Sequence, residues 1–361
     1  MNFSRDRISM QQAFIIFILA ISAPSLRVIP NYMAYFAQSA SWISTIIYLI
    51  PAFILIYVLK KLIRKKQKGL YEIYEEIFGK SINKFIIIIY IIWTLFLSSL
   101  YLRMFGERFL GTILFDANLI AIIIFMALFV YFIVNQKIDV LGRMAEVLIF
   151  FFAFIVGTVF FLIFSQIDIK NLWPVTHYDI IPVLKGAIPL LSLSSYITAM
   201  MFLGDKFSDI EKFGRIGNKA IIIIALGSLV LILSTIGVFG YQLNLQFLFP
   251  YFVTLKNINI LNTIERVESF VISTWLATDA VIISLFSLVT LHLIKKLFNL
   301  KSQRKVSIWF MILIVIISIN FAPNTYVIEE FTRDYGSWIN ISLFIILPVI
   351  AFLVGKLRKI V

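Results

Sequence analysis

The stretch MQQAFIIFILAISAPSLRVIPNYMAYFA, residues 10–37, is apolar for most of its length and carries a proline near its middle. A membrane-spanning helix needs about 20 mostly apolar residues, so this stretch is long enough to cross a bilayer. Pro24, which lies within the segment Ser22, Ala23, Pro24 and Ser25, cannot donate a backbone hydrogen bond inside a helix. The stretch therefore predicts a membrane helix that is interrupted close to Pro24.

The whole chain has the composition of a membrane protein. Of its 361 residues, 61% are hydrophobic and 14% are charged, and the mean hydropathy is +0.98. A soluble domain carries about 25% charged residues, so lipid is the expected solvent for the surplus apolar side chains. The absence of cysteine excludes disulfides and thiolate metal sites. We find no cofactor motif, no metal-ligand cluster and no catalytic constellation, so we do not expect an enzyme.

Ten apolar runs predict an all-α protein with ten transmembrane helices in one transmembrane domain over residues 1–361. The runs span residues 10–37, 41–60, 82–106, 117–135, 142–165, 181–204, 217–241, 265–294, 305–322 and 337–356. With the N-terminus placed in the cytoplasm, 24 of the 32 Lys and Arg residues fall on the cytoplasmic side and seven on the other. This bias predicts that both termini are cytoplasmic. Because the net charge of +13 sits in short loops between the runs, we do not expect a nucleic-acid partner.

The run over 181–204 carries a second set of helix-breaking residues. Gly186 and Pro189 precede the hydroxyl-rich segment Ser192, Leu193, Ser194 and Ser195. The first and sixth runs correspond if the chain is a five-plus-five inverted repeat, with one repeat over about 10–165 and the other over about 181–356. Matching breaks in inverted repeats point to a binding site at the membrane midplane. The alternative is that these residues only kink their helices.

Ionisable residues within apolar runs are costly and often functional. Asp279 lies near the middle of the eighth run, and its alternative is a neutral acid bonded to a neighbouring threonine. Arg27 follows Pro24, where it would bind an anion, partner an acidic residue or extend to the interface. Arg103 and Glu107 are one turn apart and can form an ion pair. Glu265 and Glu268 open the eighth run, where acids favour the helix dipole. We assign these charged residues other than Asp279 structural or coupling roles.

Several segments give the chain a resemblance to the spore germination permease family, within the amino acid–polyamine–organocation superfamily. The resemblance rests on the order and spacing of ISMQQ at 8–12, SWIS at 41–44, EIYEEIFGK at 72–80, LRMFGER at 102–108, GRMAE at 142–146, DIKNLWPV at 168–175 and IERVESF at 264–270. It implies the LeuT-like fold of amino acid transporters. It also implies the B subunit of a GerA-type nutrient receptor in the spore inner membrane, with A and C subunits as partners.

The resemblance also implies a pocket for a small nutrient germinant such as an amino acid, without a cofactor. Carried onto this sequence, its lining is Ser22, Ala23, Pro24, Ser25, Ser98, Tyr101, Ser192, Ser194, Ser195, Tyr196, Thr278, Asp279, Ile282 and Phe286. The apolar Ile282 and Phe286 favour an apolar ligand side chain. The alternative function is a proton- or sodium-coupled amino acid transporter, in which Asp279 relays protons.

Overall fold

The computed structural model describes residues 7–63, 68–256 and 267–361, and the side chains of 267–271 are outside this description. All regular structure in the described part is helical. The α-helices are α1 (Met10–Ala37), α2 (Ser41–Ile47), α3 (Leu49–Leu62), α4 (Leu70–Phe78), α5 (Lys80–Thr112), α6 (Leu119–Val134), α7 (Ile138–Ile163), α8 (Ile180–Ser194), α9 (Ile197–Met200), α10 (Phe213–Asn244), α11 (Pro250–Lys256), α12 (Val267–Leu297), α13 (Arg304–Asn320), α14 (Thr325–Phe331), α15 (Ser337–Ile341) and α16 (Leu347–Leu357).

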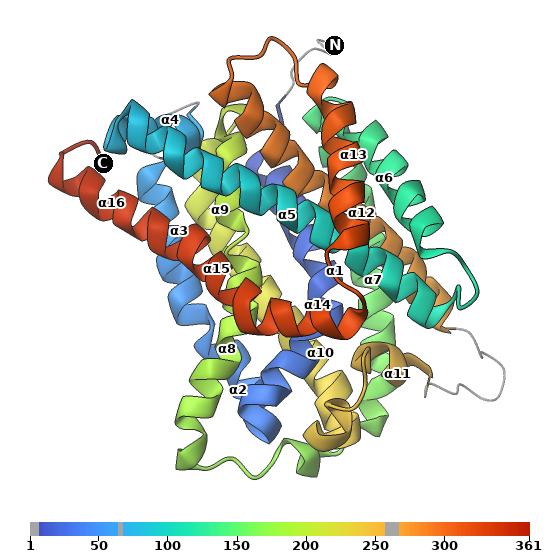
Figure 1. The fold of residues 1–361 in the computed structure, drawn as a ribbon. Helices are drawn as coiled ribbons and strands as arrows, with labels where there is room; N and C mark the ends of the chain where they lie inside the picture. The colour runs from blue at the N-terminus through green and yellow to red at the C-terminus, as the bar shows by residue number, and fades with distance from the viewer. Residues whose placement is uncertain (1–6, 64–67, 257–266) are drawn as a thin grey trace.

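Short 3-10 or π-helical turns connect several of these helices. They are η1 (Gln38–Ala40), η2 (Phe164–Gln166), η3 (Ile169–Leu172), η4 (His177–Asp179), η5 (Met201–Lys206), η6 (Ile210–Lys212), η7 (Thr332–Gly336) and η8 (Ser342–Ile346). In Figure 1 the start of α1 and the end of α16 lie toward the upper end of the bundle, and the connection from α7 to α8 lies at the lower end.

In the described residues, each predicted apolar run is helical over most of its length. Among the described residues, seven helical stretches are long and apolar enough to cross a membrane, and the first of them, Met10–Leu62, contains two predicted runs. The apolar α6 and α13 are shorter, with 16 and 17 residues. The structure therefore shows a polytopic helical protein, whereas the number of ten crossings stays a prediction.

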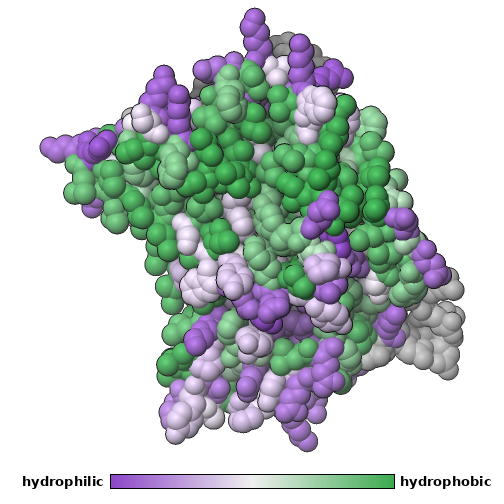
Figure 2. Space-filling model, viewed as in Figure 1, coloured by the Kyte–Doolittle hydropathy of each residue, from purple (hydrophilic) through white to green (hydrophobic). Residues whose placement is uncertain are grey.

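The outer surface carries a broad apolar band between polar ends, as Figure 2 shows for one face. Helix α7 contributes strongly to the apolar surface, since Phe150, Phe154 and Phe161 are 80%, 70% and 79% exposed. So many exposed aromatic side chains on one helix would be unfavourable in water and are favourable in lipid. The chain is therefore an integral membrane protein.

Helix α1 is the central element of the bundle and packs against α7, α8, α10 and α12. It begins with a capping box, in which Ser9 and Gln12 satisfy each other's backbone N–H groups. It then continues without interruption through Pro24 and Pro30 to Ala37. The interruption predicted near Pro24 is therefore not confirmed. Proline is tolerated inside such a helix because neighbouring helices and side chains pair the backbone groups that it frees.

The sixth predicted run changes geometry at its serine-rich segment. Helix α8 ends at Ser194, Ser195 and Tyr196 form a turn, and α9 with η5 completes the crossing. The φ and ψ angles of Ser195 and Tyr196 stay in the right-handed helical region. The path therefore tightens at this point rather than unwinding. This turn places the Tyr196 side chain in the interior of the bundle, where it is 2% exposed.

Candidate functional site

Helices α5 and α12 pack antiparallel along the centre of the bundle and bring three side-chain pairs into register. Thr290 donates to Thr94 at 2.8 Å, and the rings of Tyr101 and Phe286 stack with centroids 5.9 Å apart. At the third level Arg108 contacts Asp279. The α5 members, residues 94, 101 and 108, are seven positions apart. Because seven residues make about two helical turns, all three project from one face of α5.

The third pair, Arg108 and Asp279, is a buried ion pair. Nη2 of Arg108 lies 2.6 Å from each carboxylate oxygen of Asp279, and the two side chains are only 2% and 1% exposed. The guanidinium also stands 5.2 Å from the Trp275 ring centre, and its Nη1 donates to the Ala23 carbonyl at 3.5 Å. A charge buried this deeply is tolerated only when it is paired. The pair thus joins α5, α12 and the middle of α1.

An aromatic cluster of Tyr101, Tyr196 and Phe286 fills the space one level away from the ion pair. The two tyrosine hydroxyls are 2.7 Å apart and share a hydrogen bond. Phe286 packs edge-on against Tyr196 with ring centroids 4.8 Å apart. Asn340 of α15 donates both to the Tyr196 hydroxyl and to Ser192 Oγ at 3.0 Å. Four helical segments therefore meet at this cluster.

Most of the other predicted hydroxyl residues bond to backbone carbonyls of their own helices. Ser22 donates to Ile18, Ser98 to Thr94, Ser195 to Ser192 and Thr278 to Thr274. Ser194 instead shares a hydrogen bond of 2.9 Å with the Tyr48 hydroxyl, away from the aromatic cluster. Ile282 is fully buried on α12 between the levels of Asp279 and Phe286.

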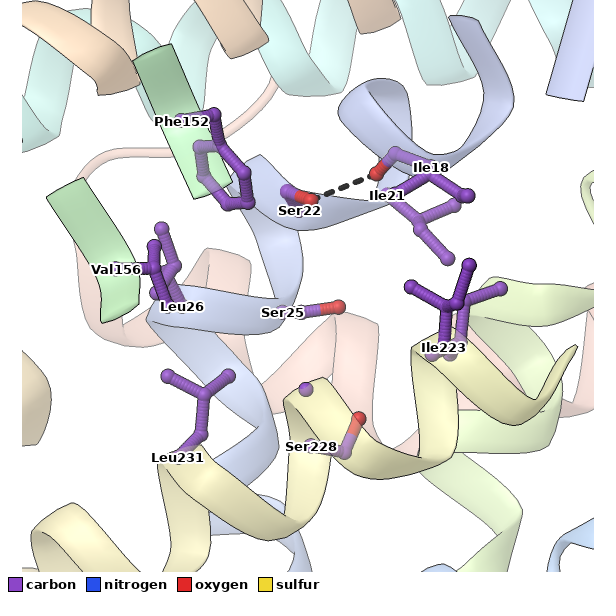
Figure 3. Close-up of a pocket in the computed structure, with 12 residues that line it drawn as sticks. Ile18, Ile21, Ser22, Ser25, Leu26, Phe152, Val156, Ile223, Ser228 and Leu231 are labelled. Atoms are coloured by element: carbon purple, nitrogen blue, oxygen red, sulfur yellow. Dashed lines mark hydrogen bonds between the residues drawn. The ribbon is translucent and has the colours of Figure 1, made fainter. Parts of the chain in front are cut away.

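Two of the four predicted residues of α1, Ser22 and Ser25, line a different cavity, which is drawn in Figure 3. Ala23 and Pro24 are buried in the bundle and do not line it. It lies between α1, α7 and α10 and holds about 100 Å³. In Figure 3 the Ser25 and Ser228 hydroxyls point into this space, whereas the Ser22 hydroxyl turns to the Ile18 carbonyl. The remaining walls are apolar and include Phe152, and no charged side chain of the described residues lines the cavity. It therefore suits an uncharged group and not a zwitterion.

Two further ion pairs involve arginines of α1 and α5. Arg27 lies 3.3 Å from Glu329 of α14, and its Nη1 donates to the Met104 carbonyl at 3.0 Å. Arg103 pairs with Glu107 at 2.8 Å and also donates to the Ser318 carbonyl at the end of α13. Arg27 therefore connects α1 to α5 and α14, and Arg103 connects α5 to α13.

The two predicted acids at the start of the eighth run cannot be placed at the site. Glu265 lies outside the described residues, and Glu268 lies in the first turn of α12 with its side chain outside the description. Within the described part of the chain, no three His, Asp or Glu side chains come close enough to hold a metal ion.

Three residues that pair with the predicted ones were not anticipated from the sequence. Arg108 lies beyond the third predicted run, which ends at residue 106, but α5 extends to Thr112 and carries Arg108 into the bundle. The apolar FLGT that follows Arg108 is the signal for this extension. Asn340 lies in the last run and Glu329 lies shortly before it. Their partners, Tyr196 for Asn340 and Arg27 for Glu329, are far away in sequence. Nothing local in the sequence marks those two residues.

Two curated proteins are similar to this chain over almost its whole length. Spore germination protein KB of Bacillus subtilis is 23% identical over 376 residues, which cover 98% of this chain and 96% of the relative. The putative spore germination protein YfkT of the same organism is 25% identical over 361 residues, covering 97% of each chain.

Solved structures with a similar fold include MhsT in complex with L-phenylalanine. It matches with a TM-score of 0.70 and 12% identity, over 98% of this chain and 90% of MhsT. A mutant of the manganese transporter of Eremococcus coleocola matches with a TM-score of 0.57 and 14% identity, over 95% of this chain and 78% of the transporter. The chain therefore has the LeuT fold of transporters.

The family profile described as spore germination protein matches residues 7–326, which is most of the chain. This chain belongs to the spore germination permease family.

Proposed function

We propose that this chain is the germinant-sensing membrane subunit of a spore nutrient receptor. A small nutrient binds among α1, α5, the α8–α9 turn and α12, and partner A and C subunits in the spore inner membrane respond. The observation that carries this proposal is the arrangement of the Tyr101, Tyr196 and Phe286 cluster directly beside the buried pair of Arg108 and Asp279.

The charges of the site favour a zwitterionic amino acid. A zwitterion adds one positive and one negative charge, so it can join the buried pair without leaving net charge in the bundle. Its carboxylate would accept from Arg108, and its ammonium group would donate to Asp279. Its side chain would lie against Ile282 and Phe286, which favour an apolar residue. The presence of L-phenylalanine in MhsT, which shares the fold, supports this ligand class.

Signalling requires two states with different affinity for the nutrient. The described state has the Tyr101 and Tyr196 hydroxyls bonded to each other, and we assign it to the nutrient-free receptor. Entry of the ligand separates the two hydroxyls and displaces α8–α9 relative to α5. In this proposal the chain crosses the membrane ten times, with both termini in the cytoplasm. Its helices form two inverted repeats, over about 10–165 and 181–356. The displacement of α8–α9 takes place at the turn formed by Ser195 and Tyr196.

The test of this function is germination of spores that carry Phe286→Ala, Phe286→Leu or Phe150→Ala, exposed to single nutrients. Phe286→Ala removes one wall of the site, and we expect the half-effective nutrient concentration to rise at least about tenfold. Phe286→Leu keeps an apolar wall and should shift the preference among nutrients with smaller loss. Phe150 is 80% exposed on α7, so its substitution controls for aromatic loss from the chain. Equal responses of all three variants, at equal receptor abundance in the membrane, would contradict the proposal.

Ion-coupled transport is the second candidate function. A mainly apolar cavity of about 300 Å³ between α1, α7 and α12 also includes Ser273, Thr274 and Thr278 in its lining, and hydroxyl oxygens can serve as cation ligands. Uptake of labelled amino acid into vesicles that contain only this chain separates the two candidates. Accumulation driven by a proton or sodium gradient would establish transport, and binding without accumulation would support the sensor.

A further inference from the structure

A polar cavity lies at the end of the bundle where α6 turns into α7 and α12 turns into α13. It holds about 250 Å³ and lies away from the proposed nutrient site. Residues 135–138, 301–303 and parts of η5 and α12 form its walls. Figure 1 shows the α12–α13 turn at the same end of the bundle as the start of α1. Three segments that are distant in sequence therefore surround one space.

The lining of this cavity is strongly basic. It includes four lysines, namely Lys137, Lys206, Lys295 and Lys301, and no carboxylate of the described residues. The nearby acids that the structure describes are already paired, since Asp139 contacts Arg143 and Asp205 contacts His292 and Lys296. Within the described part of the chain, Lys137, Lys295 and Lys301 form no ion pair, so the lining of the cavity carries a net positive charge.

Other polar side chains of the cavity can also form hydrogen bonds. His292 lines it and is only 6% exposed, and its Nε2 stands 3.3 Å from Asp205. Gln136, Ser302 and Gln303 contribute amide and hydroxyl groups. The N-terminus of the 26-residue helix α7 begins at the same wall. A helix N-terminus adds partial positive charge, which complements the lysines.

We propose that this cavity binds a phosphate group. Several ammonium groups around a water-accessible space match the charge and the oxygen acceptors of a phosphate monoester or diester. The phosphate bridges the α6–α7 turn, η5 and the α12–α13 turn, and so it fixes segments from both halves of the chain to one another. The same chemistry is offered by the headgroup of an anionic phospholipid and by free phosphate in the cytoplasm.

The excess of lysine at this end also serves membrane topology, and the experiment separates that role from binding. The purified full chain is placed in phosphatidylcholine nanodiscs, and its melting temperature is measured against inorganic phosphate, with chloride at equal ionic strength as reference. A second series replaces part of the phosphatidylcholine by phosphatidylglycerol. The variant Lys295→Gln/Lys301→Gln removes two charges from the cavity. The matched control Lys80→Gln/Lys84→Gln removes two charges from exposed positions outside it.

We expect phosphate or phosphatidylglycerol to raise the melting temperature of the wild type and of the control pair. The cavity variant should need about tenfold more of the same ligand, because two charged donors are lost. A response to phosphate in pure phosphatidylcholine identifies free phosphate as the source, and a response to phosphatidylglycerol alone identifies the lipid headgroup. The proposal is overturned if neither ligand stabilises the wild type more than chloride does. It is also overturned if the two double variants lose the response equally.

Discussion

Arg108 of α5 and Asp279 of α12 lie 2.6 Å apart in the centre of the bundle, and both side chains are almost fully buried, at 2% and 1% exposure. Arg108 follows Tyr101 by about two helical turns on the same face of α5. The α5–α12 contact therefore holds a charged level beside the aromatic level of Tyr101 and Phe286. The proposed recognition of an apolar zwitterion depends on this adjacency.

Removal of one member of the buried pair should destabilise the chain more than removal of both. Asp279→Asn or Arg108→Gln leaves an unpaired buried charge, at a cost of about 3 kcal/mol. The double variant Asp279→Asn/Arg108→Gln leaves none and should recover most of the melting temperature. Thermal unfolding of the four purified proteins in detergent measures this coupling. Additive losses in the double variant would show that the two charges do not stabilise each other.

Tyr101→Phe should make the receptor more sensitive to its nutrient. The substitution removes the bond between the Tyr101 and Tyr196 hydroxyls, which holds the nutrient-free state, while Asn340 still donates to Tyr196. A hydrogen bond of this kind contributes about 1 kcal/mol, so the half-effective concentration should fall about fivefold. Germination dose–response curves measure it.

The control for that measurement is Tyr251→Phe. The Tyr251 hydroxyl is buried in α11 without a hydrogen-bond partner among the described residues, and its loss should leave the curve unchanged. A rise in the half-effective concentration of Tyr101→Phe would mean that the hydroxyl contributes more to the bound state than to the free state.

The fold was largely predictable from the sequence because lipid imposes a strong hydrophobic signal. In the described residues each apolar run is mostly helical, and the runs over 41–60 and 181–204 contain short internal turns. The interruption near Pro24 was not confirmed because proline restricts its helix without dictating the outcome, which packing around α1 decides. The residue types alone could not reveal that Ser22 bonds within its own helix.

Part of the side-chain arrangement was expected from the family resemblance, whereas its role as a ligand site stays a prediction. Tyr101, Tyr196 and Phe286 were named from the sequence and do meet in space. Arg108 was missed because the end of the third run was placed at residue 106, whereas α5 continues to Thr112. The partnership of Asn340 with Tyr196 depends on tertiary packing, for which a single sequence carries no signal.

The predicted orientation can be tested by cysteine labelling, since the chain has no native cysteine. Tyr178 is 79% exposed in the α7–α8 connection, and Lys80 is exposed at the start of α5. In intact cells that express the chain, a membrane-impermeant maleimide should label Tyr178→Cys and leave Lys80→Cys unlabelled. Both should react after the membrane is permeabilised. Labelling of Lys80→Cys alone in intact cells would reverse the topology.

At acid pH, protonation of Asp209 should weaken its contact with the start of α1. Burial opposes ionisation of Asp209, but the Met10 backbone N–H at 2.6 Å and Lys212 at 3.0 Å stabilise its carboxylate. Together they hold the pKa of Asp209 below its ordinary value. A lowered pKa in the folded state gives stability that is complete above the unfolded value, near about 4, and is lost as pH falls through the folded value.

The melting temperature of the wild type should therefore fall more steeply below about pH 4 than that of Asp209→Asn, which cannot lose this contribution. At neutral pH the variant should be the less stable of the two. Parallel curves for the two proteins over the acid range would show that Asp209 does not contribute.

The most direct test of zwitterion recognition is equilibrium binding of an apolar L-amino acid to the purified chain, in parallel with two analogues. One analogue is the amine that lacks the carboxylate, and the other is the acid that lacks the ammonium group. We predict that only the complete amino acid binds the wild type, and that Asp279→Asn/Arg108→Gln abolishes this binding while the protein stays folded. Equal binding of the amino acid by the wild type and the double variant would contradict the account, as would equal binding of either analogue.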